Sequence, residues 1–275
     1  MRRIPLYRDA GYVWLITHRC HGNAERLRYL KDRERYLYWA REARRNHGLC
    51  VLNYTITRDH IHLLVLDQKR GEIPRSLSAI AMATARDYRA RGYSAKPFWE
   101  ERYQVTAIDD GTHLLHCLAY LDLNMVRHGR VDHPRRWSTC GYHEIVGRPS
   151  RYRVINMIAL MDLLRFRTSQ DLRAFYRNWI ETIVAADPGA KEPRWCNSLA
   201  VGRKGFIDLV RERYGGHSPD CGLTPSHNRF ILREPFQPYR HAHSALPDLT
   251  IPMHAWSTDN TLPLPALSGP PRATY

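Results

Sequence analysis

Two histidines one residue apart, His60 and His62, are the first candidates for metal chemistry in this sequence. They begin an apolar run, "HIHLLVL", of the kind that forms a β-strand. Because successive side chains on a strand point to opposite faces, both imidazoles project from one face and can converge on one ion. A lone histidine more often caps a strand or hydrogen-bonds to a neighbour. The pair therefore indicates a metal site only if a third position supplies another ligand.

A later helical segment, "HLLHCLAYLDLNMVRHG", carries side chains that suit phosphodiester chemistry. Tyr120, Asn124 and Arg127 recur at three- and four-residue spacing, on a face separate from an apolar stripe. A phenol, an amide oxygen and a guanidinium would supply a nucleophile, a metal ligand and a phosphate clamp. The alternative is a half-buried tyrosine and an asparagine at a helix end. His113 and Cys117 share this face, and we expect them to pack.

The elements that must position these residues follow the order βαββαβ. We expect strands at 11–20, 49–59, 60–66 and 98–109, and helices at 24–46 and 73–92. The short polar break before His60 predicts that the second and third strands form an antiparallel hairpin. The order predicts an α+β, ferredoxin-like βαββαβ sandwich, in which helices cover one face of a four-stranded antiparallel sheet. A further helix at 110–129, which carries Tyr120, is appended to it.

From about Arg148 onward the pattern changes to helices, with candidates at 154–164, 169–186 and 205–214, and no strand alternation is evident. After Pro238 the chain is poor in charge and rich in Pro, Ser and Thr. We therefore expect a helical extension at 148–240 and a flexible tail at 241–275.

The 275-residue chain has a formal net charge of +15, with 37 Arg against 5 Lys. Such an excess of positive charge favours the binding of polyanions, and the planar, always charged guanidinium of Arg binds phosphate through two hydrogen bonds. Nucleic acid is the expected partner, the alternative being charge that only keeps the protein soluble. No apolar segment approaches the ~20 residues that cross a bilayer, and "MRRIPLYRDA" lacks the features of a signal peptide, so we expect a cytoplasmic protein without a membrane partner.

The six cysteines form no CxxC pair, which argues against a zinc ribbon and against a disulfide framework in so large a chain. We expect them to be reduced and mostly structural.

The motifs together resemble those of the REP-associated tyrosine transposases, a branch of the single-tyrosine HUH transposases, where U is a bulky apolar residue. His60-Ile61-His62 corresponds to HUH, and "YLDLNMV" is similar to the family's tyrosine followed four residues later by Asn and then Val. The resemblance also takes in "THRCHGN", "LNYTITRDHIHLLV", "FWEERYQVTAI" and "VDHPRRWSTCGYHEI". It predicts a transposase domain at 1–147. Met125 departs from the pattern, since many relatives have proline there.

The resemblance implies that Tyr120 attacks single-stranded DNA next to a hairpin and forms a 5′-phosphotyrosine link. His60, His62 and Asn124 would hold Mg²⁺ or Mn²⁺. It also implies a bacterial, nucleoid-associated protein, monomeric or homodimeric, with no organic cofactor. Candidate DNA contacts are phosphate-binding Arg127 and Arg102, and hairpin-binding Arg19, Arg2 and Arg3. Phe98 and Trp99 are further candidates for base stacking, although we expect them to pack.

Two other classes of protein compete with this interpretation. A domesticated, catalytically idle protein would only bind DNA hairpins, but the intact set of Tyr120, Asn124 and the two histidines argues against it. A histidine-triad hydrolase needs a third alternating histidine, where this chain has Leu64. A 2H phosphoesterase needs two separate His-x-Thr/Ser motifs, which this chain lacks.

Overall fold

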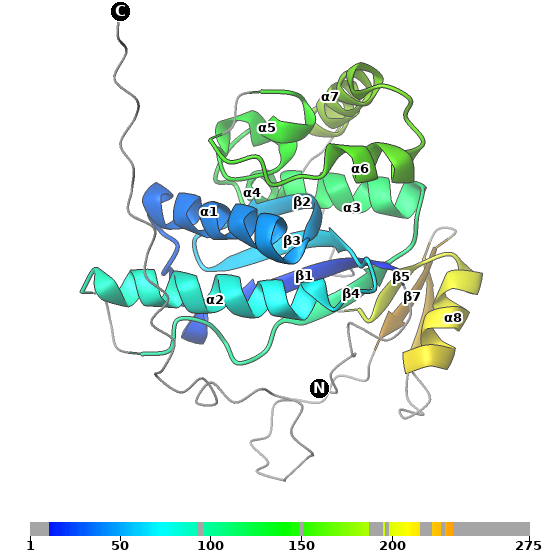
Figure 1. The fold of residues 1–275 in the computed structure, drawn as a ribbon. Helices are drawn as coiled ribbons and strands as arrows, with labels where there is room; N and C mark the ends of the chain where they lie inside the picture. The colour runs from blue at the N-terminus through cyan, green and yellow to red at the C-terminus, as the bar shows by residue number, and fades with distance from the viewer. Residues whose placement is uncertain are drawn as a thin grey trace, which may run out of the picture. The chain divides into compact units, whose positions relative to one another are not determined.

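The structure is a computed structural model that describes residues 11–92, 96–148, 151–186, 195, 198–214, 222–226 and 229–233 (Figure 1). Contacts between Cα atoms group Met1–Pro235 into one compact unit and Phe236–Tyr275 into another. The second unit, with the tail expected at 241–275, lies outside the described residues.

Four antiparallel strands form the part of the sheet that carries the histidines. They are β1 (Val13–Arg19), β2 (Cys50–Ile56), β3 (His60–Leu66) and β4 (Gln104–Ile108). β3 lies between β2 and β1, and β4 pairs with the other edge of β1. The strands are rich in β-branched and aliphatic residues, which suit a sheet buried on both faces. The α+β class and the hairpin of β2 and β3 are confirmed.

Helices cover both faces of this sheet. α1 (Leu30–His47) and α2 (Glu72–Ala90) lie side by side on one face, and α3 (Thr112–Asp122) lies on the other (Figure 1). The helix predicted to begin at residue 24 begins at Leu30 instead, because the Leu27 N–H donates to the carbonyl of Arg58 across the turn after β2. α1 ends at His47, one residue beyond the predicted end, and is followed by Gly48, whose φ of 76° is left-handed and favours glycine.

The segment predicted as one helix at 110–129 contains two. α3 ends at Asp122, and α4 (Asn124–Arg127) begins after Leu123. The guanidinium of Arg127 donates to the main-chain oxygen of Tyr120. In an uninterrupted helix, the N–H of Asn124 would donate to that same oxygen. The prediction of one continuous helix is therefore wrong at Leu123.

The chain beyond residue 140 supplies the three predicted helices, one further helix and also strands. The predicted helices are α6 (Met157–Leu164), α7 (Ser169–Ala186) and α8 (Lys204–Tyr214), and the short α5 (Tyr142–Ile145) was not predicted. β5 (Ala200–Gly202) pairs parallel with β4, and it is followed in the sheet by β7 (Arg229–Arg233) and β6 (Gly222–Ser226). The prediction that the sheet is four-stranded and wholly antiparallel is therefore wrong. A strand as short as β5 cannot show an alternating pattern.

One hydrophobic core joins the early and late parts of the chain. Leu160, Tyr176 and Ile180 from α6 and α7 are fully buried in the same cluster as Trp14 of β1. Short 3₁₀ turns at His21–Asn23 and Pro134–Arg136 complete the elements. No helix in the described ranges is long and apolar enough to cross a membrane.

The cysteines that the structure describes are buried and form no disulfide with one another, as predicted: Cys20, Cys50, Cys117 and Cys140. Cys196 and Cys221 lie outside the described residues.

Candidate active site

Polar side chains line the face of the sheet that α3 covers. On β1, Arg19 and Thr17 lie opposite His60 and His62 in the antiparallel register, and Thr55 of β2 lies opposite His62 on the other side. Directly opposed residues share a face. The two imidazole rings are 4.8 Å apart between centroids. The structure thus brings the two histidines together on the face of α3.

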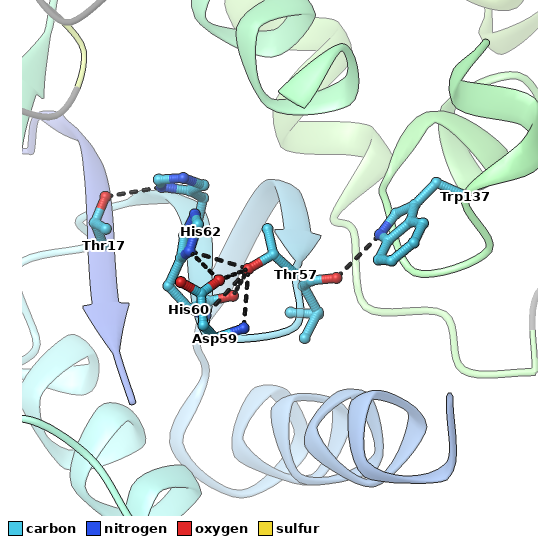
Figure 2. Close-up of polar contacts among 7 residues, drawn as sticks. Thr17, Thr57, Asp59, His60, His62 and Trp137 are labelled. Atoms are coloured by element: carbon cyan, nitrogen blue, oxygen red, sulfur yellow. Dashed lines mark hydrogen bonds and ion pairs between the residues drawn. The ribbon is translucent and has the colours of Figure 1, made fainter. Parts of the chain in front are cut away.

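His60 is oriented by two side chains from the turn between β2 and β3 (Figure 2). Its Nδ1 lies 2.8 Å from Oδ1 of Asp59 and 3.0 Å from Oγ1 of Thr57. Hydrogen bonding to His60 outweighs burial and lowers the pKa of Asp59 to about 2. The carboxylate is therefore ionised at neutral pH and can only accept a hydrogen bond. In the neutral imidazole of His60, Nδ1 is therefore the nitrogen that carries the proton, which leaves the lone pair of Nε2 for a metal ion.

His62 is buried, and its Nδ1 lies 2.8 Å from Oγ1 of Thr17 on β1 (Figure 2). Burial, with a smaller contribution from the nearby Arg19 guanidinium, holds the pKa of His62 well below its usual range. The neutral imidazole is the form that binds metal. His62 is thus ready to act as a ligand without losing a proton.

Tyr120 lies half-buried among three side chains on the same face. Its ring meets the edge of His62 at 6.0 Å between centroids, and the ring of Trp195 is also 6.0 Å away. The guanidinium carbon of Arg127 is 4.3 Å from the centre of the phenol ring. A cation at this distance is attracted to the face of the ring. The candidate nucleophile is therefore in ring contact with one of the candidate ligands.

Two buried side chains of β2 dock α3 on the sheet. The Asn53 amide donates to the carbonyl of Leu118 at 3.1 Å, and the Thr55 hydroxyl donates to the carbonyl of Leu121 at 2.5 Å. Both carbonyls belong to the last turns of α3, around Tyr120. These bonds set the height of the tyrosine above the histidines.

Asn124 carries a buried amide oxygen that could bind an ion. It is 2% exposed, and its Oδ1 has no hydrogen-bond partner among the described residues. A buried oxygen left in this way costs about 1–3 kcal/mol, so it calls for an explanation such as an ion. The described ranges hold no cluster of three His, Cys, Asp or Glu side chains placed for a metal. An ion at His60 and His62 would need other oxygen donors, and the unpartnered Oδ1 of Asn124 is a candidate.

The five arginines expected at DNA differ in their placement. Arg127 lies against Tyr120 and donates to its carbonyl. Arg19, at the end of β1, is half-buried opposite His60, and Arg102 is exposed two residues before β4 begins. Arg2 and Arg3 lie outside the described residues.

The aromatic residues Phe98 and Trp99 pack, as expected. They are 5% and 9% exposed, and the Trp99 ring stacks on His18 at 4.5 Å between centroids. His113 and Cys117 are likewise buried in α3.

Four neighbours of the site were missed from the sequence: Thr17, Thr57, Asp59 and Trp195. Asp59 and Thr57 carried a signal, because they lie one and three residues before His60 and a metal-binding histidine needs a partner for its other nitrogen. Thr17 and Trp195 carried none, since only the pairing of distant segments brings them to the site.

Comparison with known proteins gives a family match for the early part of the chain. Residues 15–123 match the family model described as "Transposase IS200 like". No curated protein matches the sequence. A solved structure of a REP-associated tyrosine transposase bound to a REP hairpin is 19% identical, with 54% of this chain and 87% of that chain covered and a TM-score of 0.46. A candidate transposase from Deinococcus radiodurans R1 is 15% identical, with 47% and 98% covered and a TM-score of 0.32.

Proposed function

We propose, on the premise that residues 15–123 belong to the IS200-like transposase family, that this chain cleaves and rejoins single-stranded DNA next to hairpins. Tyr120 is the proposed nucleophile, and the reaction passes through a 5′-phosphotyrosine intermediate. The observation that supports this best is the ring contact between Tyr120 on α3 and His62 on β3. A nucleophile and a metal ligand must lie this close to act on one phosphate.

In the proposed step, the phenol oxygen of Tyr120 attacks the phosphorus of the scissile phosphodiester. A bond forms between that oxygen and phosphorus, and the bond from phosphorus to the 3′ oxygen breaks. The phenol proton ends on the released 3′ oxygen, directly or through water. Strand transfer reverses the step, with a 3′ hydroxyl of another strand as the attacking group.

His60, His62 and Asn124 are the proposed ligands of a divalent ion. A bound ion polarises the phosphate and stabilises the charge that develops on it. The two histidines offer Nε2, and Asn124 offers its unpaired Oδ1. Imidazoles favour softer ions than magnesium, whereas phosphate and water oxygens suit Mg²⁺ or Mn²⁺, so we propose either of these two.

Arginines near the site supply the proposed electrostatics. Arg127 stands over the phenol ring, where its charge stabilises negative charge on the attacking oxygen. Arg19 and Arg102 lie near the sheet end that holds His60 and are proposed phosphate contacts, and Arg2 and Arg3 are proposed to contact the hairpin. The net charge of +15 favours such a polyanionic substrate.

The test is a covalent trapping assay with end-labelled hairpin DNA that bears a single-stranded flank, in Mg²⁺ or Mn²⁺. We expect a protein–DNA adduct on a denaturing gel, and mass spectrometry should place the DNA on Tyr120. Tyr120→Phe should abolish the adduct. Tyr29→Phe is the matched control, since Tyr29 is 54% exposed at the start of α1. An adduct that persists in Tyr120→Phe would show that another residue is the nucleophile.

The same assay separates the transposase from the catalytically idle alternative. Tight hairpin binding without any adduct in either ion, together with hairpin affinity that is unchanged in Tyr120→Phe, would identify the chain as a protein that only binds DNA hairpins.

A further inference from the structure

Residues from the late part of the chain form hydrogen bonds with Asp122, the last residue of α3. Asp122 is 1% exposed and stands between Tyr120 and Asn124 in the sequence. Its Oδ2 accepts a hydrogen bond of 2.5 Å from the hydroxyl of Tyr176 on α7, and its Oδ1 accepts one of 3.0 Å from the N–H of Tyr142 at the start of α5. Both oxygens of this buried carboxyl group are thus held by residues beyond the segment that matches the family.

A second contact reaches the candidate nucleophile itself. Trp195 is fully buried and is one of the three ring neighbours of Tyr120. Its carbonyl accepts a hydrogen bond of 3.0 Å from the hydroxyl of Thr106 on β4, which ties it to the sheet. Trp195 is therefore anchored to the sheet and packs against the ring of Tyr120.

These two contacts flank the joint between α3 and α4. The helix is interrupted at Leu123, so Tyr120 lies on one side of the joint and Asn124 on the other. A joint of this kind lets two side chains change their relative position, whereas catalysis requires both to be held closely. The hydroxyl of Tyr176 acts one residue from the joint, at Asp122.

We propose that the segment after residue 148 is part of the active site, with Tyr176 and Trp195 as positioning residues for Tyr120 and Asn124. The inference rests on the proposed function, because it assigns these residues to the same reaction. It also gives the C-terminal region a role that differs from binding DNA. Neither residue touches the DNA in this proposal; each acts through a neighbour.

The first test uses full-length Tyr176→Phe, which removes only the hydroxyl that binds Asp122. With saturating hairpin DNA and Mn²⁺, we expect the single-turnover rate of adduct formation to fall about 10-fold, while the dissociation constant for DNA stays unchanged. Tyr142→Phe is the matched control, because Tyr142 is also buried there and its hydroxyl makes no hydrogen bond among the described residues. The rate of that control should stay within about twofold.

The second test asks whether Trp195 acts through its aromatic ring or only through the volume that it fills. Trp195→Phe keeps an aromatic face toward Tyr120 and should retain most of the rate, whereas Trp195→Leu should lose about 10-fold. Trp39→Leu serves as the control, since Trp39 is also partly buried but its indole N–H donates to Asp87 between α1 and α2, away from the site. All rates are measured well below the melting temperature of each variant, so that a loss of stability alone does not lower them.

Mn²⁺ affinity, measured by electron paramagnetic resonance without DNA, provides a readout besides activity. Tyr176→Phe should bind Mn²⁺ several-fold more weakly, because Asn124 follows the joint. If the wild type forms the adduct and Tyr176→Phe matches it in both rate and Mn²⁺ affinity, the inference is overturned while the proposed function stands. A variant that loses DNA affinity at an unchanged rate overturns it as well. If the wild type forms no adduct, the proposed function fails, and the Mn²⁺ affinities of the two proteins then decide the inference alone.

Discussion

Two regions share this sheet and are joined to it in different ways: the early region, up to residue 147, and the late region, from residue 148 onward. Seven residue pairs join β1 to β3, whereas two join β5 to β4. We call the short pairing of β4 with β5 the seam. Side chains reinforce it, because Arg203, next to β5, binds the carboxylate of Asp109 at the end of β4. Gly202 lets the backbones approach, since a Cβ there would come within 2.5 Å of the Cβ of Asp109. The early region is held by a long backbone ladder, and the late region by side chains and a shared core.

This difference explains how much of the fold the sequence predicts. A ladder such as β1 with β3 needs two runs of strand-forming residues, and "VWLITHR" and "HIHLLVL" show them locally. The seam depends on a three-residue strand, one glycine and an ion pair between residues 94 positions apart. None of these features has a period that a sequence window can detect. The helices after residue 148 were predictable because each is long enough to show an amphipathic face.

The candidate site divides in the same way. The positions of His60 and His62 on one face follow from strand geometry, whereas the spacing of Tyr120 and Asn124 was predicted from a continuous helix that the structure interrupts between them. The break at Leu123 and the contacts of Asp122 do not follow, because they depend on partners from α5 and α7. Local chemistry is therefore visible in the sequence, and the supports that position it are not.

The largest effect should come from removing the late region altogether. A chain that ends at Gly147 lacks Leu160, Tyr176 and Ile180, which are fully buried in the common core. Losing one such side chain costs about 2–5 kcal/mol, against a total stability of about 5–15 kcal/mol. We expect no cooperative melting transition by circular dichroism and no DNA adduct.

The matched control for that truncation is a chain that ends at residue 240, which removes only the expected tail. It should melt like the full chain and form the adduct at the same rate. A cooperative transition and full adduct formation by the chain of residues 1–147 would instead establish that region as an independent domain. The late region would then not be needed for the stability of the sheet.

Within the early region, the strongest loss is expected at the histidines. His62→Ala should lower adduct formation by at least about 100-fold, because even the outer partners of metal-binding histidines contribute about 10–100-fold. Hairpin affinity, measured by fluorescence anisotropy, should stay within about twofold. The control is His47→Ala, at the exposed end of α1. If His62→Ala also abolished hairpin binding, the histidine would support the structure and would not act as a metal ligand.

A smaller effect is expected at the residue that orients His60. Asp59→Asn removes the charge that fixes the proton on Nδ1, and the Mn²⁺ concentration for half-maximal adduct formation should rise about 10-fold. The maximal rate at saturating Mn²⁺ should change less. Asp87→Asn is the control, since Asp87 binds Arg35 and Trp39 between α1 and α2. A fall in the maximal rate without any change in Mn²⁺ dependence would show that Asp59 does not act through the metal site.

The smallest effect is expected at the seam between the two regions. Burial tends to raise the pKa of Asp109, but the hydrogen bonds from Arg203 outweigh it and the pKa is lowered overall. A carboxyl group with a lowered folded pKa contributes stability that is complete above its unfolded pKa, about 4, and is lost as pH falls through the folded value. Arg203→Gln should therefore melt a few degrees below the wild type at pH 7, and this difference should shrink at pH 3.

The shift should be small because the Arg203 side chain is 65% exposed, so solvent screens its charge. The pH dependence decides what holds the seam. A difference in melting temperature that is the same at pH 7 and pH 3 would mean that Arg203 acts through the packing of its aliphatic stem. The ion pair would then add nothing to the pairing of β5 with β4, and Asp109→Asn should leave the melting temperature unchanged at both pH values.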